Sequence, residues 1–222
     1  AGAQRYMGPV LLLSNTELTA NNLSAVTFDS TINGGFSLGV NSAGVTQFSG
    51  QVGQTSPLAS LLTDALGSVS INTLNIATTG AQTYNDEVVL QSHTTLNASD
   101  LTFNRSIKGN DATTARNLTV NASSGDVSFN AAIGDQAARV GVFKVTAAGQ
   151  TVFQDQIRVA HLETGNTGTT VFNSTAATTT SPSSMLFGND VVIAVPTFTF
   201  DSTDGGALSN GADITFSKTL SS

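Results

Sequence analysis

Short apolar segments separated by polar residues recur along this chain. The clearest unit is an aliphatic residue, a Thr or Ser, a Phe and then Asn, Asp or Ser, and it occupies residues 26–29, 101–104, 127–130 and 214–217. In a β-strand the first and third residues share a face. We therefore expect the aliphatic residue and the Phe to point inward and the Thr or Ser outward. No 3.6-residue periodicity is sustained, so the pattern indicates an all-β chain.

A second apolar residue usually follows the aromatic residue four positions later, as Ile32 follows Phe28. A straight strand would also bury the residue two positions after the aromatic. Those positions include Asp86, Arg105, Asp155 and Lys218. Charged groups are costly to bury without a partner. The spacing therefore predicts a corner, with the strands on both sides of it facing one core.

A longer repeat overlies the short one, with offsets close to 80 residues. Residues 2–6 match 80–84, residues 38–41 match 118–121, and residues 48–53 match 129–134. Self-similarity of this kind is typical of solenoids, which accept small insertions at their corners. We expect one domain over residues 1–222, with imperfect repeats at about 1–78 and 79–160 and a partial third at 161–222.

Repeated corners around one core favour a right-handed parallel β-helix, a β-solenoid, over a β-sandwich, which would require mostly antiparallel strand pairs. Aromatic residues that open a unit lie roughly 15 to 26 residues apart, which predicts ten to twelve coils and a rod on the order of 50 Å long. Pro57, Pro182 and Pro196 are expected at corners or strand starts, where no ladder donor is needed. The segment from about 178 to 195 fits the repeat poorly, and residues 178–184 read as a loop.

The chain has few charged residues, and this argues against some classes of partner. Charged residues make up 10% of the sequence and the net charge is −7, against about 25% charged residues in globular domains. The three Lys and five Arg are scattered singly, which argues against nucleic acid as a partner. No apolar run approaches the roughly 20 residues of a membrane span. The absence of cysteine is compatible with an exported protein.

Acid–base chemistry and metal binding have few candidate residues here. Asp86 and Glu87 are adjacent, but neighbouring strand residues point to opposite faces, so they would converge only at a bend. His93 and His161 are the only histidines, and without cysteine they do not predict a zinc site.

Two motifs in the sequence resemble functional loops. Residues 35–39 fit Gly-x-Ser-x-Gly around Ser37, but no helix is expected after the Ser, as a hydrolase elbow requires. Residues 201–206 resemble the start of a calcium loop and lack its later ligands, and residues 33–35, Asn-Gly-Gly, read as another turn. We therefore expect no catalytic, cofactor-binding or metal-binding residues, and no cofactor.

The repeats resemble those of filamentous-haemagglutinin-like and autotransporter-passenger proteins, which are large exported bacterial β-helix adhesins. Residues 80–88, 125–130 and 211–217 carry the resemblance. It implies export, an elongated rod and residence at the cell surface or in a matrix, and it carries over no catalytic residue.

The sequence thus predicts a non-catalytic extracellular rod, either a segment of an adhesin or a fibre subunit. No polar cap is evident at either terminus, so the expected partners are neighbouring repeats of a longer chain or further copies joined end to end. Glycans or a host or cell surface are further candidate partners. The alternative is a carbohydrate-active or glycan-binding β-helix protein.

Overall fold

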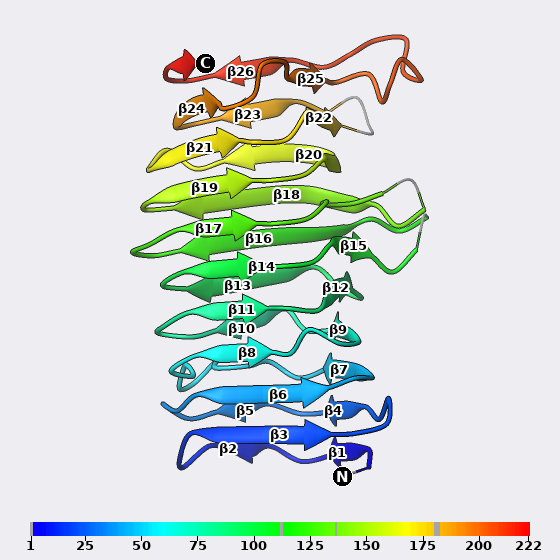
Figure 1. The fold of residues 1–222 in the computed structure, drawn as a ribbon, viewed down its shortest axis with the longest axis vertical. Coiled ribbons are helices and arrows are strands. Elements are labelled where there is room, and N and C mark those ends of the chain that lie inside the picture. The colour runs from blue at the N-terminus through cyan, green and yellow to red at the C-terminus, as the bar shows by residue number, and fades with distance from the viewer. Residues whose placement is uncertain (1, 112, 136, 180–182) are drawn as a thin grey trace.

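The structure is a computed structural model that describes residues 2–111, 113–135, 137–179 and 183–222. Its strands stack along one axis, and the chain winds around that axis in about nine turns (Figure 1). All pairs between the described strands are parallel, and those residues form no helix. The predicted parallel β-solenoid is confirmed, and the β-sandwich alternative is wrong.

Each turn of the chain contributes to three faces. Face 1 is a continuous ladder of ten strands. In order from the N-terminal end, they are β3 (Thr16–Ala20), β6 (Leu38–Ser42), β8 (Leu61–Thr63), β11 (Gln82–Tyr84), β14 (Leu101–Phe103), β17 (Val127–Phe129), β19 (Gln150–Phe153), β21 (Thr169–Phe172), β24 (Asp190–Ile193) and β27 (Leu220–Ser221).

Face 2 begins with six strands and continues through an isolated bridge at Ile133 to the start of β20. Its strands are β1 (Gln4–Tyr6), β4 (Val26–Phe28), β7 (Val45–Phe48), β9 (Ser68–Ile71), β12 (Glu87–Leu90), β15 (Ile107–Gly109), β20 (Ile157–Thr164), β22 (Ala176–Thr179) and β25 (Thr199–Asp201).

Face 3 begins with two strands and continues through a bridge at Val52. Strand β20 runs around the corner and pairs with β22 on face 2 and with β23 on face 3. The strands of face 3 are β2 (Val10–Leu11), β5 (Ile32–Asn33), β10 (Asn75–Ala77), β13 (Thr94–Ala98), β16 (Arg116–Ala122), β18 (Val140–Ala147), the end of β20, β23 (Met185–Phe187) and β26 (Ile214–Phe216).

The strands alternate between the core and the outer wall as the sequence predicts. In β4, β14 and β17 the aliphatic residue and the Phe are buried while the Thr or Ser between them is partly exposed. Because the coils are in register, each inward residue lies over another inward residue in the next coil, as Phe103 lies over Phe129. The core is therefore a set of apolar columns parallel to the axis.

The aromatic column changes face twice along the rod. Tyr6, Phe28 and Phe48 stack on face 2, with ring centroids 5.0 and 5.5 Å apart. A second stack, from Tyr84 to Phe172, lies on face 1 with spacings of 5.0 to 5.2 Å. Phe187 and Phe216 then stack on face 3 at 4.9 Å.

The change of face follows the 80-residue repeat of the sequence. Residues 2–6 lead into or form β1 on face 2, whereas the matching residues 80–84 lead into or form β11 on face 1. From β1 to β11 the chain makes three turns and passes two further faces. The repeat in sequence is therefore not a whole number of turns.

The predicted count of ten to twelve coils is too high. Several turns carry aromatic residues on two faces, as Phe143 on β18 and Phe153 on β19 do. Counting aromatic residues therefore overestimates the number of turns. Residues 178–195, which fit the sequence repeat poorly, contain β23, β24 and the end of β22. Of the loop predicted at residues 178–184, residues 178 and 179 are in β22 instead, and residues 180–182 lie outside the described residues.

The turn residues lie mostly where the sequence places them. Pro57 lies between the bridges at Val52 and Leu58, and Pro196 lies between β24 and β25, whereas Pro182 is outside the described residues. Gly34 has a φ of +126°, and a Cβ there would come within 2.3 Å of the carbonyl oxygen of Leu12. The Asn-Gly-Gly turn is confirmed.

Truncating a ring in the middle of the stack should be strongly destabilising. Phe129 is buried between Phe103 and Phe153 at 5.1 and 5.0 Å. We expect Phe129→Ala to lower the free energy of unfolding by about 3–5 kcal/mol, measured by urea denaturation with far-UV circular dichroism. Phe36→Ala, at a ring that is 38% exposed, is the control and should change it by less than about 1 kcal/mol. Equal losses in the two variants would contradict the stack.

Candidate functional site

The residues considered for chemistry are dispersed around the rod. The hydroxyl of Ser37 accepts a hydrogen bond from the Ser60 hydroxyl at 2.8 Å. Nδ1 of His93 accepts one from the backbone N–H of Asn117 at 2.9 Å. His161 lies 3.9 Å from the Glu163 carboxylate on face 3. None of these contacts joins Ser37 to a histidine, so the described residues do not assemble a Ser-His pair.

Residues 201–206 form a turn rather than an open ligand loop. The Asp201 carboxylate accepts hydrogen bonds from the backbone and hydroxyl of Thr203 and from the backbone of Gly205, at 2.6–2.7 Å. The hydrogen bond from the Thr203 side chain, foremost, holds the pKa of Asp201 below its ordinary value. Asp204 pairs with Arg158 and, at 3.6 Å, with Arg139. Both carboxylates are therefore already satisfied by the protein.

Four of the predicted corner positions hold a charged residue, and the prediction for Asp86 is wrong. We expected the charged corner residues to stay out of the core, and Arg105, Asp155 and Lys218 are exposed. Asp86 instead has a relative exposure of 0%, and neither carboxylate oxygen has a hydrogen-bond partner among the described residues. Its side chain lies inside the corner between β11 and β12.

The surroundings of Asp86 favour its neutral form. Burial is the main cause, and the negative charge of Asp64 adds to it, while the positive charge of Arg105 opposes both. Together they raise the pKa of Asp86 to about 7. The carboxyl group therefore titrates near neutral pH. The sequence shows a charged residue at this corner, but the burial of Asp86 depends on contacts with the preceding and following coils.

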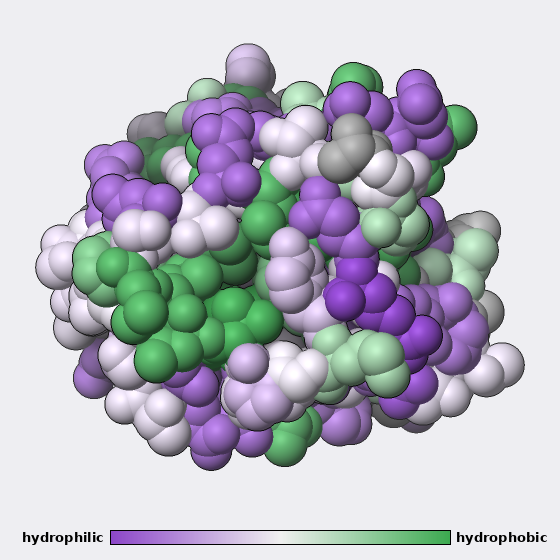
Figure 2. All heavy atoms as spheres, turned by 90° about the horizontal axis from the view of Figure 1, so that it is seen from below, coloured by the Kyte–Doolittle hydropathy of each residue, from purple (hydrophilic) through white to green (hydrophobic). Residues whose placement is uncertain are grey.

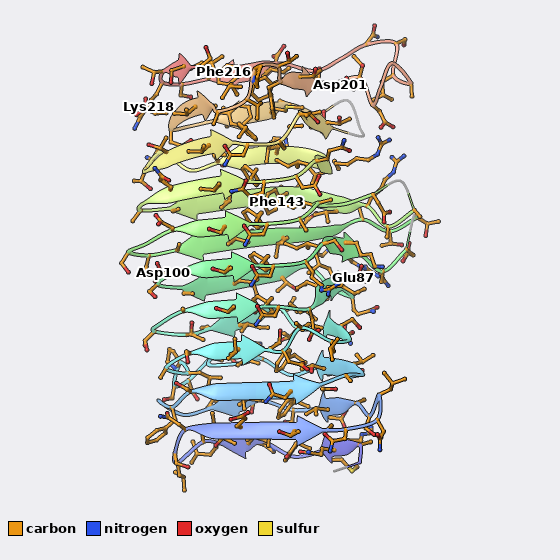
Figure 3. The ribbon with its side chains drawn as sticks, in the orientation of Figure 1. Glu87, Asp100, Phe143, Asp201, Phe216 and Lys218 are labelled. Carbon is orange, nitrogen blue, oxygen red and sulfur yellow. The ribbon has the colours of Figure 1, made fainter. Side chains whose placement is uncertain are left out.

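Glu87, the neighbour of Asp86, points to the outer wall and does not join it in a carboxylate pair. Its carboxylate lies 2.7 Å from the Lys108 ammonium and accepts a hydrogen bond from the Ser106 hydroxyl at 3.0 Å. Figure 3 shows Glu87 and Asp100 at opposite edges of the rod. No group of three or more His, Cys, Asp or Glu side chains placed for a metal ion occurs within the described ranges.

The outer wall has shallow hollows. One, of about 480 Å³, opens where Ala131 and Ala132 leave space between Arg105 and Asp155. Another, of about 330 Å³, lies over Gly39 between Glu17 and Leu62. Neither contains a buried catalytic arrangement.

Side chains connect one coil to the next along the wall. Asn104 donates to Asn85 at 2.6 Å and accepts from Asn130 at 2.7 Å. At other corners a side chain caps a free backbone N–H of the following coil, as Asp126 caps Gln150 at 2.6 Å. Much of the polar surface is thus engaged in holding coils together.

Apolar residues are exposed on the first and last described coils, and these two coils are the strongest candidate for an interaction site. Figure 2 looks at the N-terminal end and shows an apolar patch. Three exposed apolar residues of the first coil, Met7, Leu11 and Leu13, are 75%, 64% and 78% exposed. At the other end a hollow of about 450 Å³ is lined mainly by Ile193, Val195, Pro196, Phe198, Phe200 and Leu220.

Replacing Asp86 should change how stability depends on pH. Because the pKa is about 7 in the folded chain and about 3.9 when unfolded, ionisation opposes folding. The chain should lose stability as pH rises from about 4 to 7 and level off above 7. Asp86→Asn should flatten this profile. Three pKa units are about 4 kcal/mol, so the substitution should raise Tm at pH 8 by roughly 8–16 °C, measured by thermal circular dichroism from pH 4 to 9.

Asp155→Asn changes an exposed carboxylate in the equivalent position of another corner. This control should keep the wild-type pH profile. A D86N variant that is less stable than wild type at pH 8 would contradict the assignment of Asp86 as an unpaired buried acid.

The described part of the chain contains no helix long and apolar enough to cross a membrane. Comparisons with protein-family models, with curated proteins and with solved structures find no match for this chain.

Proposed function

We propose that the chain is a non-catalytic extracellular β-solenoid with a structural or adhesive role. It is either a segment of a bacterial surface adhesin or a subunit of an extracellular fibre that assembles end to end. The observation that carries the proposal is the set of apolar columns that runs through the rod. Their first and last residues, such as Val10 and Phe216, are only partly buried, and exposed apolar residues lie beside them. Exposed strand edges and apolar patches of this kind favour association.

The wall of the rod supports a structural role. Its charges are few, and several form pairs, such as Lys144 with Glu163 at 2.5 Å. Its asparagine ladders connect successive coils. Such a wall provides a stable surface rather than a reactive one.

The resemblance of the repeats to filamentous-haemagglutinin-like and autotransporter-passenger proteins supports an exported bacterial origin. The lack of cysteine suits a rod whose stability comes from a long continuous core. We place the protein at the cell surface or in the extracellular matrix on these grounds.

Glycan binding is the second function that the sequence left open. Small-molecule sites are usually concave and lined by apolar and aromatic side chains. The hollows over Gly39 and beside Ala131 are lined by no aromatic side chain. The hollow that Phe198 and Phe200 line is on the last coil, where end-to-end assembly would cover it. We therefore rank glycan binding below the structural role.

Negative-stain electron microscopy at several protein concentrations tests the proposal. Filaments one solenoid wide, with an axial repeat of roughly 45 Å from about nine turns at ~4.8 Å each, are the expected result. Isolated short rods at all concentrations would contradict end-to-end assembly.

A matched pair of variants locates the contact. Leu11→Lys/Leu13→Lys places two charges at the exposed end and should shorten the filaments or abolish them. Leu66→Lys/Leu74→Lys changes leucines that are 63% and 64% exposed away from the ends, and it should leave filament length unchanged.

A further inference from the structure

We infer that the two ends join in a single register that continues all three faces into a second copy of this chain. This inference rests on the proposed end-to-end assembly and specifies its geometry. The last strands β25, β26 and β27 of one copy would pair with the first strands β1, β2 and β3 of the next. Each pair would be parallel, as all pairs between described strands within the chain are.

The register follows from the columns already present in the rod. On face 3 the inward column that begins at Val10 and Ile32 ends at Phe187 and Phe216. Continuing it places Val10 of the next copy over Phe216. The outward column beside it then places Leu11 over Ser217, the residue that follows β26.

The other two faces follow the same rule. On face 2 the outward column begins at Arg5 and Thr27 and ends at Thr178 and Asp201. On face 1 the outward column begins at Glu17 and ends at Ser221. In the continued register Arg5 therefore lies over Asp201, and Glu17 lies over Ser221.

Charge and apolar surface both favour this register. The Arg5 side chain pairs with Asp29 of the second coil at 2.6 Å and is still 67% exposed, so its positive charge would face the negative Asp201 across the joint. Turning the second copy by one face would place Glu17 over Asp201 in one case, which brings two like charges together, and Leu11 over Asp201 in the other. In the continued register the half-buried Val10 of one end covers the half-buried Phe216 of the other.

Because the chain contains no cysteine, any disulfide that forms in a variant must involve the introduced cysteines. Neighbouring parallel strands bring outward Cα atoms to about 4.8 Å, within the range a disulfide spans. We would prepare four double variants under mild oxidation: Leu11→Cys/Ser217→Cys, Glu17→Cys/Ser221→Cys, Leu11→Cys/Ser221→Cys and Glu17→Cys/Ser217→Cys. The four single variants control for symmetric dimers, since a single cysteine cannot extend a ladder.

The first two double variants should give ladders of covalent multimers on non-reducing gels, and the last two should stay monomeric. A ladder from Leu11→Cys/Ser221→Cys or from Glu17→Cys/Ser217→Cys would identify one of the two turned registers and overturn the inference. Filaments without ladders in any variant would also overturn the register while leaving end-to-end assembly intact. The absence of both filaments and ladders would reject the assembly itself.

Discussion

Backbone hydrogen bonds between successive coils hold this rod together, and they require each coil to lie in register over the one before. The N–H of Gln4 donates to the carbonyl of Ala25, and the N–H of Asp29 donates back to the carbonyl of Tyr6. With coils about 4.8 Å apart, each side chain meets the same position of the next coil. Aromatic rings therefore stack on rings, and wall asparagines bond to asparagines. The columns, the corners and the open ends all follow from this repeated contact.

Much of the fold was predictable from the sequence because the coils stack in register, so the inward and outward positions of one strand recur in the next coil. The alternation in residues 101–104 predicts which side chains face inward. The apolar residue four positions after Phe103 predicts a corner between the two. The migration of the aromatic column was not predictable in this way. A unit of the same type forms a strand on face 2 at Phe28 and on face 1 at Phe103, because the unit specifies a strand and a corner but not the face. The number of turns was overestimated for the same reason.

The candidate site was less predictable because it depends on contacts between coils. The sequence correctly indicated a turn at residues 201–206, and it did not reveal that Asp86 is buried. A short corner places that side chain between the preceding coil, which carries Asp64, and the following coil, which carries Arg105, so its neighbours lie about one coil away in sequence. The register proposed between two copies could be inferred only from the strand pairs on all three faces.

The described coils stack in register along one axis, and a distance between two spin labels on the same face measures this stacking. Leu62 and Val192 both point outward on face 1, and five intervening strands separate them in an unbroken ladder. Nitroxide labels at Leu62→Cys and Val192→Cys, diluted with unlabelled chain, should give a narrow distance distribution centred at about 29 Å, six steps of ~4.8 Å. A broad distribution, or a centre displaced from this value by more than about 10 Å, would contradict the stacked coils on which the fold and the proposed assembly depend.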